Sequence, residues 1–342
     1  MKNKAFYEHL VNFHNQEAGT SITLKEGSIH SILPRVDMTD QVIWFSERLE
    51  ALLLLFNRFM HHKQTGSRAI HLFLLFHLAI RRNMYEKAEE LLTLFHEEIK
   101  DWQETEEKLK SYRLLVSLQC SVILGHEMSH IYYAQHPDLL KNNIDEMRHR
   151  VRGYKEQFNT DKPLFIKLLH FFSEKIKNLQ EQSYDEAIGD DFLLEELCCD
   201  ESAWQMVGNI IKSMDLEADT TAEVCAYAGL SLSFMQSKRT LENIYLEPGQ
   251  DIRERDLRFD TSRHTLYNII VWDYIDEVGK KASKYFQSLI NDYQRIGYAI
   301  LMKDMHKEID HIAYIRHAPE GKYSLKDVKR LEAMYKEIHL FI

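Results

Sequence analysis

Proline and glycine are scarce in this chain, with 5 and 12 copies among 342 residues. These two residues are the strongest local breaks in regular structure, so long stretches are left in which a helix can continue. Between the breaks, apolar residues recur at helical spacing, as in residues 86–95. The sequence therefore predicts a mainly α-helical protein.

Cysteine is also rare. Only Cys120, Cys198, Cys199 and Cys225 occur, in a long chain whose basic N-terminal residues are followed by no apolar segment or cleavage site typical of a secretion signal. This pattern favours reduced thiols over a disulfide framework. We therefore expect a cytoplasmic protein.

Long apolar runs and an excess of positive charge are both missing. The longest uncharged apolar stretches, residues 69–80 and 114–125, hold about a dozen residues each, whereas a spanning helix needs roughly 20. They predict buried helices and no membrane span. The formal net charge is −10 and no long basic run offsets it. Attraction to a phosphate backbone would therefore be weak, and we expect no nucleic-acid partner.

The expected elements are mostly long helices. Two alternating apolar runs in residues 21–33, separated by Glu26 and Gly27, predict a small N-terminal β-hairpin. Residues 246–256 are the clearest loop. Helices are expected near residues 39–63, 66–81, 83–100, 104–135, 163–182, 190–213, 219–239, 262–304 (with a break near 279) and 324–341.

One of these helices carries a candidate metal site. His126, Glu127 and His130 form a His-Glu-x-x-His motif late in an apolar helical segment. Residues four apart lie about 40° apart around a helix axis, so both imidazoles project from one face and can share a tetrahedral Zn²⁺. Glu127 lies beside them, where it can take a proton from an activated water and return it to a leaving amine. Without a ligand, burying these groups would be unfavourable.

A catalytic zinc usually has three protein ligands, and Glu196 is the strongest candidate for the third. It lies in the apolar helical stretch 192–204, with Asp200 one turn later on the same face. Glu196 would bind the metal. Asp200 would accept the free ring N–H of a zinc-bound histidine and so fix its tautomer.

Two other residues compete with Glu196. His136 stands where a longer metal motif has its last histidine, but Tyr133 replaces the glycine that lets the chain turn back there. If the helix continues instead, His136 points away from the zinc face. Glu195 is the other alternative. The identity of the third ligand stays open at this point.

The two motif segments resemble the gluzincins, in which His-Glu-x-x-His is followed on a later helix by Glu-x-x-x-Asp, often with an alanine three residues further on. Ala203 fills that place here. The resemblance implies that Glu196 is the third ligand and that Asp200 supports the site. It also implies a zincin-like, two-lobed metallopeptidase with its active site in a cleft between the lobes. Cys198 and Cys199 depart from the small residues usual in that helix. A more distant similarity is to phage-exclusion peptidases of the Lit type.

On this basis we expect an N-terminal lobe of residues 1–150 with the His-Glu-x-x-His helix, and a helical C-terminal lobe of residues 151–342 with the Glu-x-x-x-Asp helix. The expected activity is zinc-dependent hydrolysis of a peptide bond in a specific cytosolic protein. A cytosolic protease without a visible propeptide must be restrained, by narrow specificity, by a regulatory protein partner or by a trigger. That need, with the Lit-type similarity, suggests stress response, toxin action or phage defence.

Two alternatives come from other protein classes. Two Glu-x-x-His strings, Glu146 to His149 and Glu308 to His311, are typical of helical di-iron carboxylate proteins. A helical regulatory or interaction protein with a structural metal site is the other alternative, although such a site has no use for Glu127 as a base.

Other features carry weaker expectations. Cys198 and Cys199 are expected to be small core residues, and the basic run at residues 148–152 a solvated helix end. Four side chains are admissible as stabilisers of the oxyanion formed during hydrolysis, and the sequence does not choose among them: Tyr132, Tyr133, Tyr227 and His264.

Overall fold

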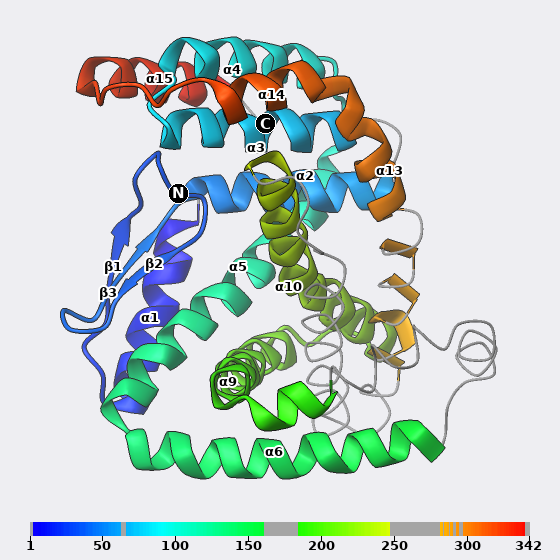
Figure 1. Ribbon diagram of the computed structural model, residues 1–342. Helices are drawn as coiled ribbons and strands as arrows, with labels where there is room; N and C mark the ends of the chain where they lie inside the picture. Colours follow the sequence, from blue (N-terminus) through cyan, green and yellow to red (C-terminus); the bar gives the residue numbers. More distant parts are fainter. Residues whose placement is uncertain are drawn as a thin grey trace. The chain divides into compact units, whose positions relative to one another are not determined.

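The computed structural model describes residues 3–62, 66–160, 184–246 and 281–338, the last range with gaps at 283, 287, 290, 291 and 294–296. Within these ranges the chain is mainly helical, with one small three-stranded sheet (Figure 1). The mainly α prediction is confirmed. None of the helices described in these ranges combines the length and the apolarity needed to cross a membrane.

The chain forms two compact units. Unit 1 comprises Met1–Cys120, Ser237–Gly249 and Gln287–Ile342, and unit 2 comprises Ser121–Gln236 and Gln250–Phe286. Two long helices, α5 (Glu106–Gln135) and α10 (Ala218–Leu246), contribute residues to both units. The expected lobes of residues 1–150 and 151–342 were divided elsewhere, since residues 121–150, with the start of α6 (Pro137–Thr160), belong to unit 2 and residues 287–342 belong to unit 1.

Unit 1 holds the sheet and most of the shorter helices. Its core is centred on α2 (Glu47–His61) and α3 (Ser67–Arg81), whose residues are nearly all buried. Its other elements follow in chain order: α1 (Lys4–Ala18), β1 (Thr23–Glu26), β2 (Arg35–Asp37), β3 (Val42–Phe45), α4 (Tyr85–Ile99), α13 (Tyr298–Asp304), η2 (Met305–Glu308), α14 (Ile309–His317) and α15 (Leu325–Glu337). Unit 2 holds α6, α9 (Asp191–Ser213) and parts of α5 and α10.

The sheet has the order β1-β3-β2, with β1 parallel and β2 antiparallel to β3. The expected hairpin at residues 21–33 is therefore wrong, because only its first half, β1, is a strand. Ser28 turns the chain locally: its carbonyl accepts the Ser31 N–H at 3.1 Å and its hydroxyl accepts the His30 N–H at 3.3 Å. Side-chain bonds of this kind compete with strand pairing.

The expected helix at residues 39–63 begins later, at Glu47. Its first residues form β3 instead, because the β-branched and aromatic run 42–45 suits a strand. Ser46 then starts α2 by accepting the Arg48 N–H at 3.2 Å.

Most other expected helices are confirmed within a few residues, namely α3, α4, α5, α9 and α15, while α10 continues to Leu246. Helices α1, α6 and α14 were not expected. Their apolar stripes are thin, since within α14 only Ile312 and Ile315 are buried. The helices expected at residues 163–182 and 262–280 lie outside the described residues, as do residues 247–256 of the expected loop.

The apolar stretch 69–80 is a buried helix, as expected, and it contains a buried histidine. His77 is 1% exposed, and its ring centroid lies 4.6 Å from that of Phe73 and 4.8 Å from that of Phe76. Burial, reinforced by the positive charges of Arg48 and Lys238, holds the pKa of His77 well below its ordinary value of 6.5. The folded protein therefore keeps this imidazole neutral.

Unfolding should depend on pH through His77. The unfolded chain gains a proton as the pH falls below about 6.5, whereas folded His77 does not. Its contribution to stability is complete above that pH and is lost as the pH falls toward the folded pKa. We expect His77→Met to remove up to about 1.4 kcal/mol per pH unit of this slope, measured by urea unfolding between pH 7 and 5.

Two other side chains help to interpret the pH dependence of stability in His77→Met. His71 acts in the same direction, since burial lowers its pKa to about 4, so His77→Met should remove only part of the pH dependence. Phe73→Met removes a buried ring of the same helix but no titratable group, and it should leave the slope unchanged. An equal slope in the wild type and in His77→Met would contradict the prediction.

Candidate metal centre

The candidate site lies within unit 2 and uses two helices. The second half of α5 carries His126, Glu127 and His130, and the first half of α9 carries Glu196. Asp190 begins α9 by accepting the N–H groups of residues 192 and 193 at 3.0 and 3.3 Å. This cap sets the start of the helix one and a half turns before Glu196.

The two helices approach closely at Gly125. A Cβ atom added there would lie 3.1 Å from both Cα and Cβ of Ala203, and 2.5 Å from Cε of Met206. The contact is buried, with Ala203 1% exposed, and it is formed by two small residues, Gly125 and Ala203. Glu196 is two turns before Ala203 on α9, and His126 follows Gly125 directly. The close contact therefore brings the acidic face of α9 to the histidines.

Gly125→Ala should destabilise the protein. The new methyl group would press on the α9 backbone, and overpacking of this kind costs about 1–3 kcal/mol, more than the roughly 0.5–1 kcal/mol that alanine adds in a helix. Gly153 in α6 is the matched control, because a Cβ there meets nothing within 4 Å. Gly153→Ala should stabilise. Urea unfolding checks both, and stabilisation by both variants would contradict the packing argument.

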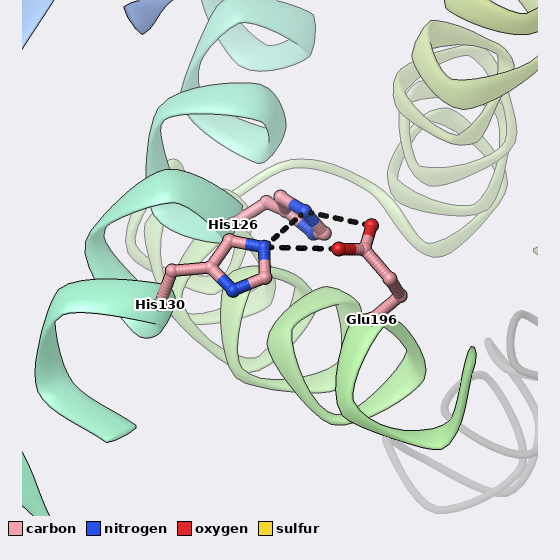
Figure 2. Close-up of side chains that lie close together, drawn as sticks. All are labelled: His126, His130 and Glu196. Carbon is pink, nitrogen blue, oxygen red and sulfur yellow. Dashed lines mark hydrogen bonds and ion pairs between the residues drawn. The ribbon is translucent and has the colours of Figure 1, made fainter. Parts of the chain in front are cut away.

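The three candidate ligands converge on one point (Figure 2). Nε2 of His126 and Nε2 of His130 lie 3.1 Å apart. The Glu196 carboxylate faces both rings, with Oε2 3.4 Å from His126 Nε2 and Oε1 3.2 Å from His130 Nε2. In a tetrahedral zinc site with bonds of 2.0–2.1 Å, ligand atoms lie about 3.3 Å apart. The observed separations fit one ion shared by these three side chains.

Asp200 lies behind His126. Its side chain is fully buried, and Oδ1 lies 2.7 Å from His126 Nδ1. A carboxylate at this distance accepts the Nδ1–H proton, so that Nε2 keeps the lone pair that binds a metal. No water competes for this bond, because Asp200 is 0% exposed.

His130 is held differently. Its Nδ1 atom lies 3.4 Å from Sγ of Cys199 and 3.5 Å from Oε1 of Glu195. From the sequence, Glu195 was a candidate metal ligand and Cys199 a core residue, and neither was predicted to lie beside His130. The position of Glu195 next to Glu196 on α9 was the feature of the sequence that could have predicted this contact.

Both cysteines beside the site are buried, as expected for core residues. Burial raises the pKa of the Cys198 thiol to about 12. Burial, with the Glu196 carboxylate next in effect, also raises the pKa of the Cys199 thiol far above its usual range. Among the described residues, neither thiol belongs to the group of potential ligands that His126, His130 and Glu196 form, which favours Glu196 over a cysteine as the third donor.

Glu127 and His136 have separate positions. Glu127 is half-buried and follows His126 on α5, but it does not belong to the three-residue cluster. His136 is exposed at the junction of α5 and α6, where its ring lies 4.5 Å from that of Tyr132. Because α5 stays helical through Tyr133, the chain makes no turn that would bring His136 back to the cluster.

Tyr133 joins the end of α5 to its neighbours. Its hydroxyl lies 3.0 Å from Ser202 Oγ on α9 and accepts a hydrogen bond from Asn143 on α6 at 3.0 Å. Of the four admissible oxyanion stabilisers, Tyr133 thus uses its hydroxyl group in hydrogen bonds to α9 and α6. His264 lies outside the described residues. Tyr132 and Tyr227 are half-buried on α5 and α10.

The basic run at residues 148–152 is not a solvated helix end. Helix α6 packs against α9 (Figure 1), and the run supplies ion pairs between them. Arg148 binds Asp191, and Arg150 contacts Glu201 at 2.6 Å. These arginines therefore fix α9, the helix that presents Glu196.

The two Glu-x-x-His strings do not form a di-iron site in the described structure. Glu146 and His149 are exposed on α6 in unit 2. Glu308 and His311 belong to unit 1, where Glu308 accepts a hydrogen bond from Arg68 Nε at 2.8 Å. In the part of the chain that the structure describes, neither string belongs to a group of three potential metal ligands.

The cluster of two imidazoles and one carboxylate can hold a metal ion, with Glu127 close by on the same helix. A comparison of the chain with protein-family models, with curated proteins and with solved structures finds no match.

Proposed function

We propose that this chain is a zinc-dependent metallopeptidase of the gluzincin type. In this proposal His126, His130 and Glu196 hold the zinc ion and Glu127 is the general base. The observation that carries it is the convergence of the two histidine Nε2 atoms and the Glu196 carboxylate at separations of 3.1–3.4 Å. The gluzincin resemblance adds a role for Asp200 behind His126.

The donor set favours zinc over several other metals. Magnesium and calcium prefer oxygen ligands, whereas zinc takes imidazole and carboxylate donors together. Non-haem Fe(II) also binds two histidines and one carboxylate. Glu127 favours the hydrolytic alternative, because a carboxylate beside the metal position has a defined task there as a proton acceptor.

A bound zinc ion would lower the pKa of a water molecule and polarise the scissile carbonyl group. The Glu127 carboxylate would accept a proton from the attacking water as the water oxygen bonds to the carbonyl carbon. Glu127 returns the proton to the amide nitrogen as the C–N bond breaks. Asp200 keeps the His126 proton on Nδ1 throughout, which leaves Nε2 directed at the metal position.

The proposed substrate is a protein or peptide in the cytoplasm. A protease free in that compartment must be restrained, by narrow specificity, a regulatory partner or a trigger. We therefore propose cleavage of one or a few proteins, in stress response, toxin action or phage defence. The number of proteins that the purified chain cleaves tests both the activity and the narrow specificity.

The test is to incubate purified protein with a cell lysate and to label all new amino termini. We expect a small set of new termini with the wild type, and none with Glu127→Gln or with wild type stripped of metal. Termini that appear equally with Glu127→Gln would come from a contaminant and contradict the proposal. So would the absence of any new terminus with metal-loaded wild type. Cleavage of many unrelated proteins would contradict the restraint.

A further inference from the structure

The two metal-facing histidines have unequal support. His126 Nδ1 has a buried carboxylate, Asp200, at 2.7 Å. His130 Nδ1 has two neighbours at longer range, Cys199 Sγ at 3.4 Å and Glu195 Oε1 at 3.5 Å. The Glu195 side chain is 33% exposed, whereas that of Asp200 is 0% exposed.

The chemistry of the ring decides which neighbour matters. A neutral imidazole that offers Nε2 to a metal carries its proton on Nδ1, and that proton needs an acceptor. A thiol sulfur is a weak acceptor, whereas an ionised carboxylate makes hydrogen bonds roughly twice as strong as neutral groups do. Of the two neighbours of His130 Nδ1, Glu195 is therefore the stronger partner.

Glu195 and Glu196, which are adjacent on α9, thus contact different nitrogen atoms of the His130 ring. The Glu196 carboxylate lies at Nε2 of His130, on the metal side, and the Glu195 carboxylate lies at Nδ1, on the opposite side. The two acids enclose the imidazole from one helix. Rotation of the ring about its Cβ–Cγ bond would break both contacts.

We propose that Glu195 is a positioning residue that orients His130 for metal binding, with Cys199 packed against the same nitrogen. This inference rests on the metal site of the proposed function, but not on peptide hydrolysis. Because water reaches Glu195, its effect is smaller than that of Asp200. Outer carboxylates of this kind typically change metal affinity by about 10–100-fold, and Glu195 belongs at the lower end of that range.

The experiment titrates metal-free protein with Zn²⁺ against a chromophoric chelator, and with Co²⁺ while its visible absorption is recorded. We expect Glu195→Ala to weaken Zn²⁺ binding about 10-fold and to shift the Co²⁺ bands. Glu195→Gln should recover most of the affinity, because its amide oxygen still accepts the Nδ1–H proton. Asp200→Asn should weaken binding more than Glu195→Gln does.

Two further variants serve as controls. Glu223→Ala removes an exposed carboxylate from α10 in the same unit and should match the wild type in affinity and in Co²⁺ spectrum. Cys199→Ala should weaken binding less than Glu195→Ala does. Wild-type affinity and spectrum in Glu195→Ala would overturn the proposal, and so would a larger loss in Cys199→Ala.

The result also separates this inference from the proposed function. If the wild type binds neither Zn²⁺ nor Co²⁺, the metal site fails and the role of Glu195 fails with it. If Glu195→Ala behaves as expected but the wild type cleaves no peptide, the peptidase proposal alone is overturned.

Discussion

Glu127→Gln is expected to slow peptide hydrolysis by about 10²–10⁴-fold, the range that a positioned general base contributes, while the zinc content stays that of the wild type. Glutamine keeps the size of the side chain, but its amide cannot take the proton from the attacking water. Glu127 lies outside the group of three potential ligands, so its substitution should leave the proposed zinc ion in place. Steady-state kinetics on a peptide spanning an identified cleavage site, with metal analysis of the same samples, measures both quantities.

The loss should fall on kcat, because Glu127 acts on the reaction and not on peptide binding. Glu223→Gln, which changes an exposed carboxylate of the same unit in the same way, should retain wild-type kcat and KM. Two results count against the role of Glu127. One is hydrolysis within a few-fold of the wild type in Glu127→Gln, and the other is a matching loss of zinc, which would make Glu127 a ligand.

The pair of histidines could be predicted from the sequence alone. Four-residue spacing on a helix puts His126 and His130 on one face whatever the tertiary structure. The third donor could not be obtained in this way, because it depends on which later helix packs against α5. That packing is set by Gly125 and Ala203, whose small size matters only when the two backbones face each other. The resemblance to a known motif supplied what spacing could not.

The misplaced elements have local causes. Residues 42–45 form β3 although they precede a strongly apolar helix, and only the helix-capping residue Ser46 separates the two patterns. Helix α6 was not expected because, within its described side chains, burial is confined to Met147 and Val151, and ion pairs hold it to α9 instead. The boundary of the units falls within α5 and α10, where an unbroken helical pattern gives no sign of it.

Removal of a ligand should have an effect as large as removal of the base. Structural zinc sites in small peptides have four ligands and contribute about 10–16 kcal/mol, so one ligand contributes roughly 2.5–4 kcal/mol, or about two to three orders of magnitude in affinity. We therefore expect about one zinc per wild-type chain purified without chelator or added metal, and only traces in His130→Ala and Glu196→Ala. His136→Ala is the matched control, since His136 is exposed and outside the cluster. Inductively coupled plasma mass spectrometry measures the content.

Other results for the metal content would each support a different third ligand or a different class of protein. If Glu196→Ala keeps its zinc and His136→Ala loses it, the third ligand is His136 and the gluzincin proposal is wrong. One iron per chain would favour oxygen chemistry at the same three residues, and two irons would favour a di-iron carboxylate protein. A folded wild type without metal would favour a helical interaction protein. Circular dichroism of every variant separates these outcomes from unfolding, because only a folded chain that lacks zinc has lost a ligand and not its structure.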